Sequence, residues 1–348
     1  MCVQVAENNA CGRINIEVRV SLCRFFQRLL GTCRVAGLLC ASAALLVLTG
    51  CPRQNSAQPL RQVELRAPEG QPMMLAAYQA WFGKPNHINV GYSSLDRVTL
   101  ARQIDDAKNL GIRGFAVNWY GTGRDAGKDL EDRSYALLQS LAAEKDFHTA
   151  IMYDESEDPV HATEESIRDL TYAWEHYISP QAPASSAYLT YRDRPVIFIF
   201  QKSGKTDWRR VRQAMESWSP KPLLLYKDVA PSKADVMDGF YAWVHPDHGW
   251  SSDGKDWGEG YLNDFYSKMS SRYSDKLAVG AAWPGFNDSK ASWSRNRRID
   301  PRCGKTFDDS LRVFRRYYND SHPLPFLLIV TWNDYEEGTA IERGIPHC

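Results

Sequence analysis

Three carboxylates lie close together near the end of the sequence. The stretch LIVTWNDYEEGTAIE, residues 328–342, begins as a β-branched apolar run and then places Asp334, Glu336 and Glu337 among aromatic and amide side chains. Glycoside hydrolysis needs two carboxyl groups in distinct roles. Asp334 and Glu337 are three residues apart, so both can face one cavity if the chain turns after the strand, while Glu336 would point to solvent. The alternative is a surface acid cluster neutralised by arginines such as Arg343.

From residue 73 onward, strand patterns alternate with helix patterns. The expected strands cover residues 74–82, 114–121, 148–155, 194–200, 222–229, 239–246, 277–285 and 325–332. Helices are expected at 94–111, with Ser94 as the N-cap, and at 130–145, 164–177, 208–218, 261–273 and 307–318, with only a short connection after the fifth strand. Continuous apolar strands alternating with helices, repeated to eight, are typical of a (β/α)8 TIM barrel of the α/β class. The alternative, an open doubly wound sheet, lacks a glycine-rich nucleotide motif after any strand.

Polar and aromatic residues recur at the C-terminal ends of these strands, where such barrels place their functional groups. The candidate substrate-binding residues are Tyr78, Trp81, Asn118, Trp119, Tyr120, Tyr153, Asp154, Glu155, Tyr226, Trp243, His245, Trp283, Asn287, Asp288, Asn333 and Tyr335. Aromatic rings stack on the C–H faces of sugars, and carboxylates accept hydrogen bonds from hydroxyl groups. Any one of these aromatics is more simply explained as core packing. Their recurrence favours a polyhydroxylated ligand, and we expect Trp81, Trp119, Tyr153, Trp243 and Trp283 to line a cleft.

Charge and metal-ligand patterns narrow the function further. The sequence has 42 Lys plus Arg and 42 Asp plus Glu. It therefore lacks the excess of basic residues that would indicate a nucleic-acid partner. A metal-dependent hydrolase or deacetylase is another possible function, because His245 and His248 are three residues apart. However, no H-E-x-x-H cluster accompanies them. We therefore expect no metal and no cofactor. After Cys51 only Cys303 and Cys348 remain, and these two can form a disulfide only in an oxidising compartment.

The first fifty residues have the pattern of a leader. Arg24, Arg28 and Arg34 precede an uncharged run at 35–48 that is too short to span a bilayer comfortably. The LTGC that follows resembles the lipobox of a bacterial lipoprotein signal peptide, which implies cleavage before Cys51 and lipidation of that residue. The alternative is an ordinary N-terminal anchor.

The domain boundaries follow from this leader. Residues 1–50 are expected to be a signal peptide, residues 51–72 a lipidated cysteine with a flexible polar tether, and residues 73–348 a single barrel domain. The implied location is the bacterial cell envelope, at the outer membrane or cell surface in a Gram-negative organism, with a membrane contact through the lipid anchor.

The opening motif also resembles known families. WNDYEEGTAIE, residues 332–342, resembles the F-N-E-W-H-E-G-T-Q-I-E type segment of glycoside hydrolase family 99, the endo-α-mannosidase and endo-α-mannanase group, and the W-N-D-Y-G-E-S segment of family 71, the α-1,3-glucanases. QIDDAKNLGIRGFAVNWYG at 103–121, and WPGFND at 283–288 with RRIDPRCGKTF after it, look like further family 99 segments. The resemblance covers most of residues 75–342. It implies a barrel enzyme that cleaves an α-linked polysaccharide or glycan, of mannan or glucan type, in endo fashion.

The resemblance assigns roles residue by residue. Glu337 falls where both families have a Glu, which in family 99 is the acid/base that protonates the leaving oxygen. Asp334 falls where family 99 has a Glu that deprotonates the sugar 2-hydroxyl, and where family 71 has an Asp of an inverting pair. Asn287 replaces the first Asp of the usual P-G-F-D-D segment, and Asp288 keeps the second.

The expected electrostatics follow from these roles. Apolar neighbours and nearby acids would raise the pKa of Glu337 toward neutrality, while Asp334 would stay ionised. An alternative hypothesis, from another functional class, is that the protein is a non-catalytic glycan-binding lipoprotein on a degenerate barrel. That both acid positions are filled favours the enzyme.

Overall fold

The computed structural model describes residues 72–122, 129–246, 256–319, 324–345 and 348. All of them belong to one compact unit that spans Gln58–Cys348. The predicted signal peptide, Cys51, all but the last residue of the tether, and His248 lie outside the described residues. Among the described helices, none is both long enough and apolar enough to cross a membrane.

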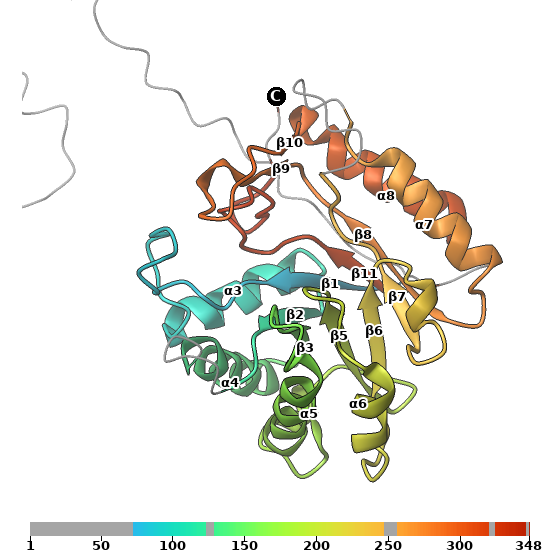
Figure 1. The fold of residues 1–348 in the computed structure, drawn as a ribbon. Coiled ribbons are helices and arrows are strands. Elements are labelled where there is room, and N and C mark those ends of the chain that lie inside the picture. The colour runs from blue at the N-terminus through green and yellow to red at the C-terminus, as the bar shows by residue number, and fades with distance from the viewer. Residues whose placement is uncertain (1–71, 123–128, 247–255, 320–323, 346–347) are drawn as a thin grey trace, which may run out of the picture. The chain divides into compact units, whose positions relative to one another are not determined.

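Eight parallel strands form a closed barrel (Figure 1). They are β1 (Met73–Tyr78), β2 (Gly114–Trp119), β3 (His148–Asp154), β5 (Arg194–Phe200), β6 (Leu223–Lys227), β7 (Gly239–Tyr241), β8 (Leu277–Ala282) and β11 (Phe326–Ile329). Pairing of β1 with β11 and of β3 with β5 completes the ring. All eight predicted strands are present, which confirms the (β/α)8 barrel.

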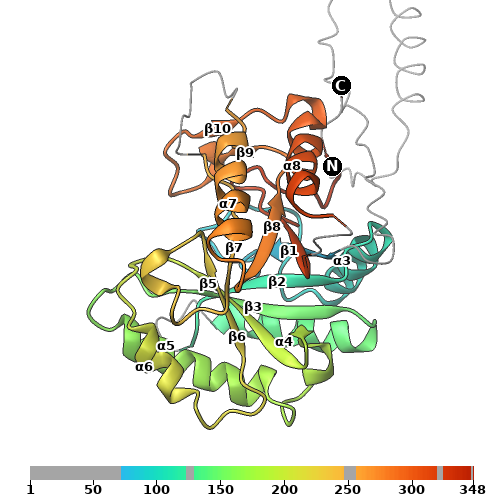
Figure 2. The same cartoon turned by 90° about the vertical axis from the view of Figure 1, so that its right-hand side faces the viewer.

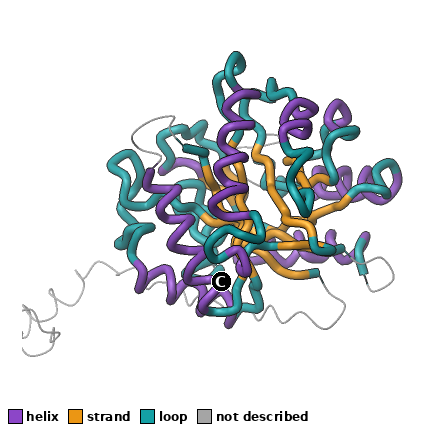
Figure 3. Tube along the Cα trace, turned by 90° about the horizontal axis from the view of Figure 1, so that it is seen from below, coloured by secondary structure: helices purple, strands orange, loops and turns teal. Residues whose placement is uncertain are grey.

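Helices surround the strands, as the view from below shows (Figure 3). They are α3 (Arg97–Asn109), α4 (Asp129–Glu144), α5 (Ala162–Ala173), α6 (Trp208–Ala214), α7 (Glu259–Ser271) and α8 (Lys305–Tyr317). As predicted, β6 and β7 are joined by a short segment, which contains a single 3₁₀ turn at Pro231–Lys233. Helices α7 and α8 pack side by side over β8 (Figure 2). Two short strands, β9 (Phe286–Asn287) and β10 (Arg298–Ile299), form a hairpin between β8 and α8, and β4 (Thr190–Tyr191) pairs antiparallel with β5.

The start of α3 differs from the sequence expectation. Asp96 is the N-cap, because its carboxylate accepts a hydrogen bond from the Val98 N–H at 3.0 Å. The predicted cap, Ser94, instead accepts a hydrogen bond from the Phe82 N–H at 3.0 Å. Ser94 therefore fixes the loop after β1, two residues before the N-cap of the helix.

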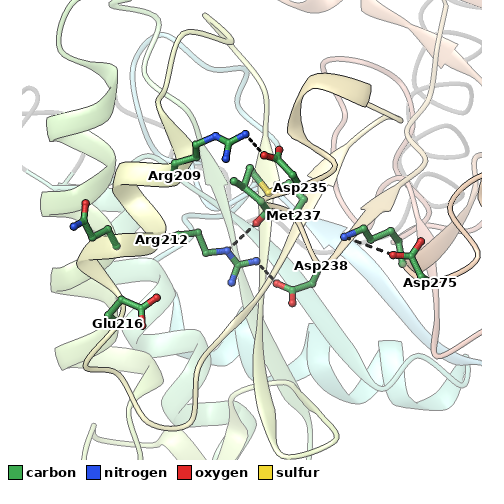
Figure 4. A pocket seen from close by; sticks show the side chains of 10 residues that line it. Arg209, Arg212, Glu216, Asp235, Met237, Asp238 and Asp275 are labelled. Atoms are coloured by element: carbon green, nitrogen blue, oxygen red, sulfur yellow. Dashed lines mark hydrogen bonds and ion pairs between the residues drawn. The ribbon is translucent and has the colours of Figure 1, made fainter.

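Ion pairs lie at the end of the barrel where the strands begin, between α6 and the starts of β7 and β8 (Figure 4). Arg212 donates to the Val236 carbonyl at 2.8 Å and pairs with Asp238. Asp238 in turn accepts a hydrogen bond from the Leu224 N–H at 2.9 Å. These contacts border a hollow of about 530 Å³. Because they tie strand starts to a helix at the face that does not carry catalysis in such barrels, we assign them to stability.

A disulfide ties down the C-terminal residue. Cys303 and Cys348 are bonded, with their Cα atoms 5.0 Å apart and 45 residues between them in sequence. The bridge joins the chain end to the turn that precedes α8. The pairing that sequence left open is therefore present.

Candidate active site

A cavity of about 550 Å³ opens among the C-terminal ends of the strands. Its volume falls in the range of small-molecule sites. The predicted residues that line it are Trp81, Asn118, Tyr120, Asp154, Trp243, His245, Asp334 and Glu337. The lining therefore includes both members of the proposed carboxyl pair.

Asp334 follows β11 and is almost fully buried, with 1% of its surface exposed. Its Oδ1 accepts hydrogen bonds from the N–H groups of Glu336, at 3.1 Å, and Glu337, at 2.8 Å. Its Oδ2 accepts a hydrogen bond from Gln79 Nε2 at 3.1 Å. The two bonds to Oδ1 form the turn that brings Asp334 and Glu337 to the same cavity. Burial raises the pKa of Asp334 well above its ordinary value, and the charge of Glu337 adds to the effect.

Glu337 is half-buried and faces the cavity from the same turn. Its Oε1 accepts a hydrogen bond from Trp293 Nε1 at 3.0 Å. Burial raises the pKa of Glu337, although the Trp293 hydrogen bond and the charge of Arg297 oppose this. The expectation for Glu337 has the right direction. The sequence expectation for its partner is that Asp334 stays ionised; burial raises the pKa of Asp334 as well, while the backbone N–H groups of Glu337 and Glu336 oppose that rise.

Glu336 does not point to solvent, contrary to the sequence expectation. It is 1% exposed, and its Oε2 lies 2.7 Å from His87 Nδ1 while Oε1 accepts a hydrogen bond from the Ile88 N–H at 3.1 Å. The His87 ring stacks on Trp81, with centroids 4.7 Å apart and planes 8° apart. The loop after β1 therefore folds over Glu336, and Glu336 anchors that loop and its Trp81 platform.

The β-pleat decides which strand-end residues reach the cavity, because successive side chains point to opposite faces. On β2, Asn118 lines the cavity, whereas the indole of the next residue, Trp119, donates to Asp132 of α4. On β3, Asp154 lines the cavity, and the hydroxyl of the preceding Tyr153 donates to α5. Trp119 and Tyr153 therefore pack against helices, and their predicted place in the cleft is wrong.

Three more predicted aromatics are buried for related reasons. Tyr78 on β1 donates its hydroxyl to Gln103 of α3 at 2.7 Å. The ring of Tyr226 on β6 packs edge-on against Trp208 of α6, with centroids 6.3 Å apart. Trp283, just beyond β8, donates its indole N–H to the Trp257 carbonyl at 3.0 Å and is fully buried. None of the three lines the cavity.

Two predicted acids shape loops instead of facing the cavity. Glu155 accepts hydrogen bonds from the N–H groups of Lys202, at 3.2 Å, and Gly204, at 2.9 Å. Asp288 accepts from the Arg297 N–H and Nε, both at 2.8 Å, and from the Arg295 N–H at 3.1 Å. Burial alone would raise the pKa of Asp288, but these hydrogen bonds hold it below its ordinary value. Asp288 thus holds the loop that carries Trp293.

The remaining predicted polar residues also support the turn. Asn333 is fully buried and pairs with the backbone of Gln79, accepting from its N–H at 2.7 Å and donating to its carbonyl at 3.0 Å. The Tyr335 hydroxyl donates to Glu342 at 2.8 Å. Asn287 caps a 3₁₀ turn by accepting a hydrogen bond from the Ser289 N–H at 3.1 Å. These contacts direct all three side chains away from the cavity lining.

Asp154 and two lysines lie on one side of the cavity, where β3, β5 and β6 end. Lys202 Nζ is 3.5 Å from Asp154 Oδ1, and Lys227 Nζ lies 4.0 Å from the centroid of the Phe200 ring. Burial raises the pKa of Asp154 to about 6 in spite of Lys202. Burial also lowers the pKa of Lys227. This side of the cavity therefore combines a weakly acidic carboxyl group with two ammonium groups.

Several lining residues were not among the predicted site residues. They are Gln79, Lys84, Asn86, His87, Glu131, Glu157, Phe200, Lys202, Lys227, Val244, Pro246, Phe286, Ser292, Trp293, Arg295 and Arg297. Gln79 and Lys227 each follow a strand-end tyrosine by one residue and so point to the opposite face from it, but the strand pattern does not show which face is the inner one. Trp293 had no usable sequence signal, since it belongs to a long loop. Within the described residues, no group of three or more His, Cys, Asp or Glu side chains is placed to hold a metal ion.

These features define a (β/α)8 barrel with a carboxyl pair after its last strand. The structure is similar to that of the GH99 endo-alpha-mannosidase from Bacteroides thetaiotaomicron in complex with BIS-TRIS-propane, with a TM-score of 0.59 and 18% identity over 78% of this chain and 86% of that chain. A second structure of that enzyme gives a TM-score of 0.58 and 18% identity over 78% and 87%. A glycoside hydrolase-like protein gives 0.57 and 13% over 84% and 90%.

The sequence matches no protein-family model and no curated relative. The likeness to the two family 99 structures confirms, at the level of the fold, the resemblance that the sequence motifs carry. At these identities the likeness establishes the barrel, and the reaction has to be argued from the site.

Proposed function

We propose that the chain is a glycoside hydrolase that cleaves an α-linked polysaccharide or glycan in endo fashion. One observation carries the proposal: Asp334 and Glu337 line the same cavity, and burial raises the pKa of both. A carboxyl group that donates a proton near neutral pH needs a raised pKa, and its partner must be able to take up a proton. The fold shared with the family 99 structures supports the same reaction class.

In this mechanism Glu337 protonates the leaving glycosidic oxygen. It is the more exposed member of the pair, as expected for the group that meets the leaving sugar. Asp334 acts as the base. Two N–H groups and the Gln79 amide hold its carboxylate in one orientation, which suits proton abstraction from a fixed direction.

The base has two possible targets, which differ in stereochemistry. If Asp334 activates a water molecule, the product anomer is inverted. If it deprotonates the sugar 2-hydroxyl, that oxygen attacks the anomeric carbon and displaces the leaving group, which forms a three-membered ring. Water then opens this three-membered ring and restores the starting configuration. Proton NMR of the first-formed anomer distinguishes the two routes.

The test of the function is release of reducing ends from a panel of α-mannans and α-glucans. Glu337→Gln keeps the size of the side chain and removes the acid, so kcat should fall by about 10²–10⁴ on polysaccharide. The loss should be smaller on an activated aryl glycoside that the site accepts, because its leaving group needs little protonation. Glu144→Gln changes an exposed acid of α4 and serves as the matched control. Unchanged polysaccharide cleavage by Glu337→Gln, or glycan binding with no cleavage by the wild type, would refute the proposal.

We further propose that the protein is a lipoprotein of the bacterial cell envelope, anchored through Cys51. The LTGC sequence after an uncharged run motivates this. The Cys303–Cys348 disulfide supports it, because such bonds persist in oxidising compartments. Cys51→Ala should release the protein from membranes or block its processing, as judged by fractionation. Unchanged membrane association would contradict lipidation as the anchor.

A further inference from the structure

The two sides of the cavity differ in the hydrogen-bonding groups they present. On the β1–β2 side, three buried oxygens have no hydrogen-bond partner among the described residues: Gln79 Oε1, Asn118 Oδ1 and Glu131 Oε2. All three residues line the cavity. A buried acceptor without a partner calls for a ligand or water to satisfy it. This side therefore presents acceptors, which suit the hydroxyl groups of a neutral sugar.

The β5–β6 side presents cations. The ammonium groups of Lys202 and Lys227 lie 5.6 Å and 4.0 Å from the centroid of the same Phe200 ring, so both reach one region of the cavity. Lys202 lies 3.5 Å from Asp154. No hydrogen bond or ion pair joins the Lys227 ammonium to another described residue.

The acids around the two lysines are placed differently. Lys202 lies near buried Asp154, and the other acid near Lys202, Glu157, is 3.9 Å away with 84% of its side chain exposed. An exposed pair of this kind contributes little. Burial also raises the pKa of Asp154 to about 6, which weakens it as a permanent counter-ion. The charges of Asp228, Asp154 and Glu337 act on Lys227, but none of these carboxylates forms an ion pair with its ammonium group.

The contacts of Lys227 leave its N–H donors unused. The half-buried side chain places its ammonium over the Phe200 ring, and this cation–π contact satisfies none of the three N–H donors. The lysine makes chemical sense if an anion occupies the space that it faces.

We propose that the β5–β6 side of the cavity binds an anionic substituent of the glycan, a carboxylate or a sulfate ester, through Lys227 and Lys202. The substrate class is then an acidic α-glycan whose neutral part meets the acceptors of Gln79 and Asn118. This inference rests on the proposed hydrolase function for its kinetic test, but the anion site itself can be tested by binding alone.

The test uses one α-glycan in three forms: neutral, with part of its primary hydroxyl groups oxidised to carboxylates, and with sulfate esters at a matched density. The wild type should show at least a tenfold higher kcat/KM on one of the charged forms, and the preferred form identifies the anion. Lys227→Met and the double variant Lys202→Met/Lys227→Met should bring the ratio of charged to neutral kcat/KM close to one. Lys227→Arg, which keeps the charge, should retain a preference.

Lys205→Met is the matched control, because Lys205 follows β5, as Lys202 does, but does not line the cavity. It should leave the ratio at the wild-type value. Equal kcat/KM on all three forms by the wild type, or a preference that persists in the double variant, would overturn the proposal.

Binding separates the failure of this inference from the failure of the proposed hydrolysis. Calorimetry with Glu337→Gln measures the affinity for the oxidised, sulfated and neutral glycans without turnover. A preference for a charged form that disappears on adding Lys227→Met upholds the anion site even if the wild type cleaves nothing. Equal affinities for all three glycans overturn the anion site even if the wild type cleaves them.

Discussion

Trp293 offers a direct way to alter the proposed acid without touching it. Its indole N–H donates to Glu337 Oε1 at 3.0 Å, and its ring packs edge-on against Trp81, with centroids 5.8 Å apart. Trp293→Phe removes the donor and keeps an aromatic ring for the Trp81 contact. A hydrogen bond to a carboxylate favours the ionised form, so its loss should raise the pKa of Glu337 further.

The size of the effect follows from the contact. A hydrogen bond to a charged group contributes ~1.5–3 kcal/mol, and partial access to water reduces this. Trp293 is 39% exposed, so we take a value below this range, ~1 kcal/mol. That corresponds to roughly a fivefold change in the proton dissociation constant of the acid.

The assay is the pH dependence of kcat/KM on a cleaved glycan. Loss of the Glu337 proton sets the basic limb of the profile, and in Trp293→Phe this limb should move to higher pH. Trp174→Phe, in a half-buried Trp that stacks on Trp218, controls for the general effect of the substitution. A basic limb that stays in place or moves to lower pH, at retained kcat/KM, would refute the assignment of Glu337 as the acid that Trp293 contacts.

Three further outcomes test the scaffold. Asp238→Asn breaks the ion pair with Arg212 and should lower the free energy of unfolding by ~1–3 kcal/mol in a denaturant titration, with kcat/KM unchanged because the cluster lies at the other end of the barrel. Cys303→Ser opens the bridge to Cys348 and should cost ~2–4 kcal/mol, seen as a lower Tm than that of the wild type. Hydrogen bonds hold the pKa of Asp288 below its ordinary value, so the stability that Asp288 adds is fully present above about pH 4. This stability is lost as the pH falls through the lower pKa of the folded state. Asp288→Asn should therefore flatten the fall in Tm on acidification.

The barrel was predictable because its strands leave a strong signal. Each is a continuous apolar run, and each run ends near a polar or aromatic cluster. The same property limits what sequence can say about the site. A barrel strand is buried on both faces, so an apolar pattern does not reveal which of two neighbours points inward. Tyr226 and Lys227 illustrate this, because the tyrosine faces α6 and the lysine faces the cavity.

Contacts between loops were beyond reach for a different reason. Trp293 meets Glu337 only because Asp288 folds the loop after β8 back over the strand ends. His87 meets Glu336 only after β1 and β11 have paired in the closed ring. Both contacts join residues that are far apart in sequence, so residue spacing carries no information about either of them.

The three acids of the opening motif now have three different environments, and the difference explains why they stand together. Glu336 is fixed to His87 and the Ile88 backbone, so its charge orders the loop after β1. Asp334 accepts two backbone N–H groups of the turn, so it shapes the turn while remaining open to the cavity. Only Glu337 combines partial exposure with a raised pKa, the two properties that a proton donor to a bound sugar requires. A single turn thus combines a scaffold residue with the proposed base and the proposed acid, all from neighbouring positions directly after the last strand of the barrel.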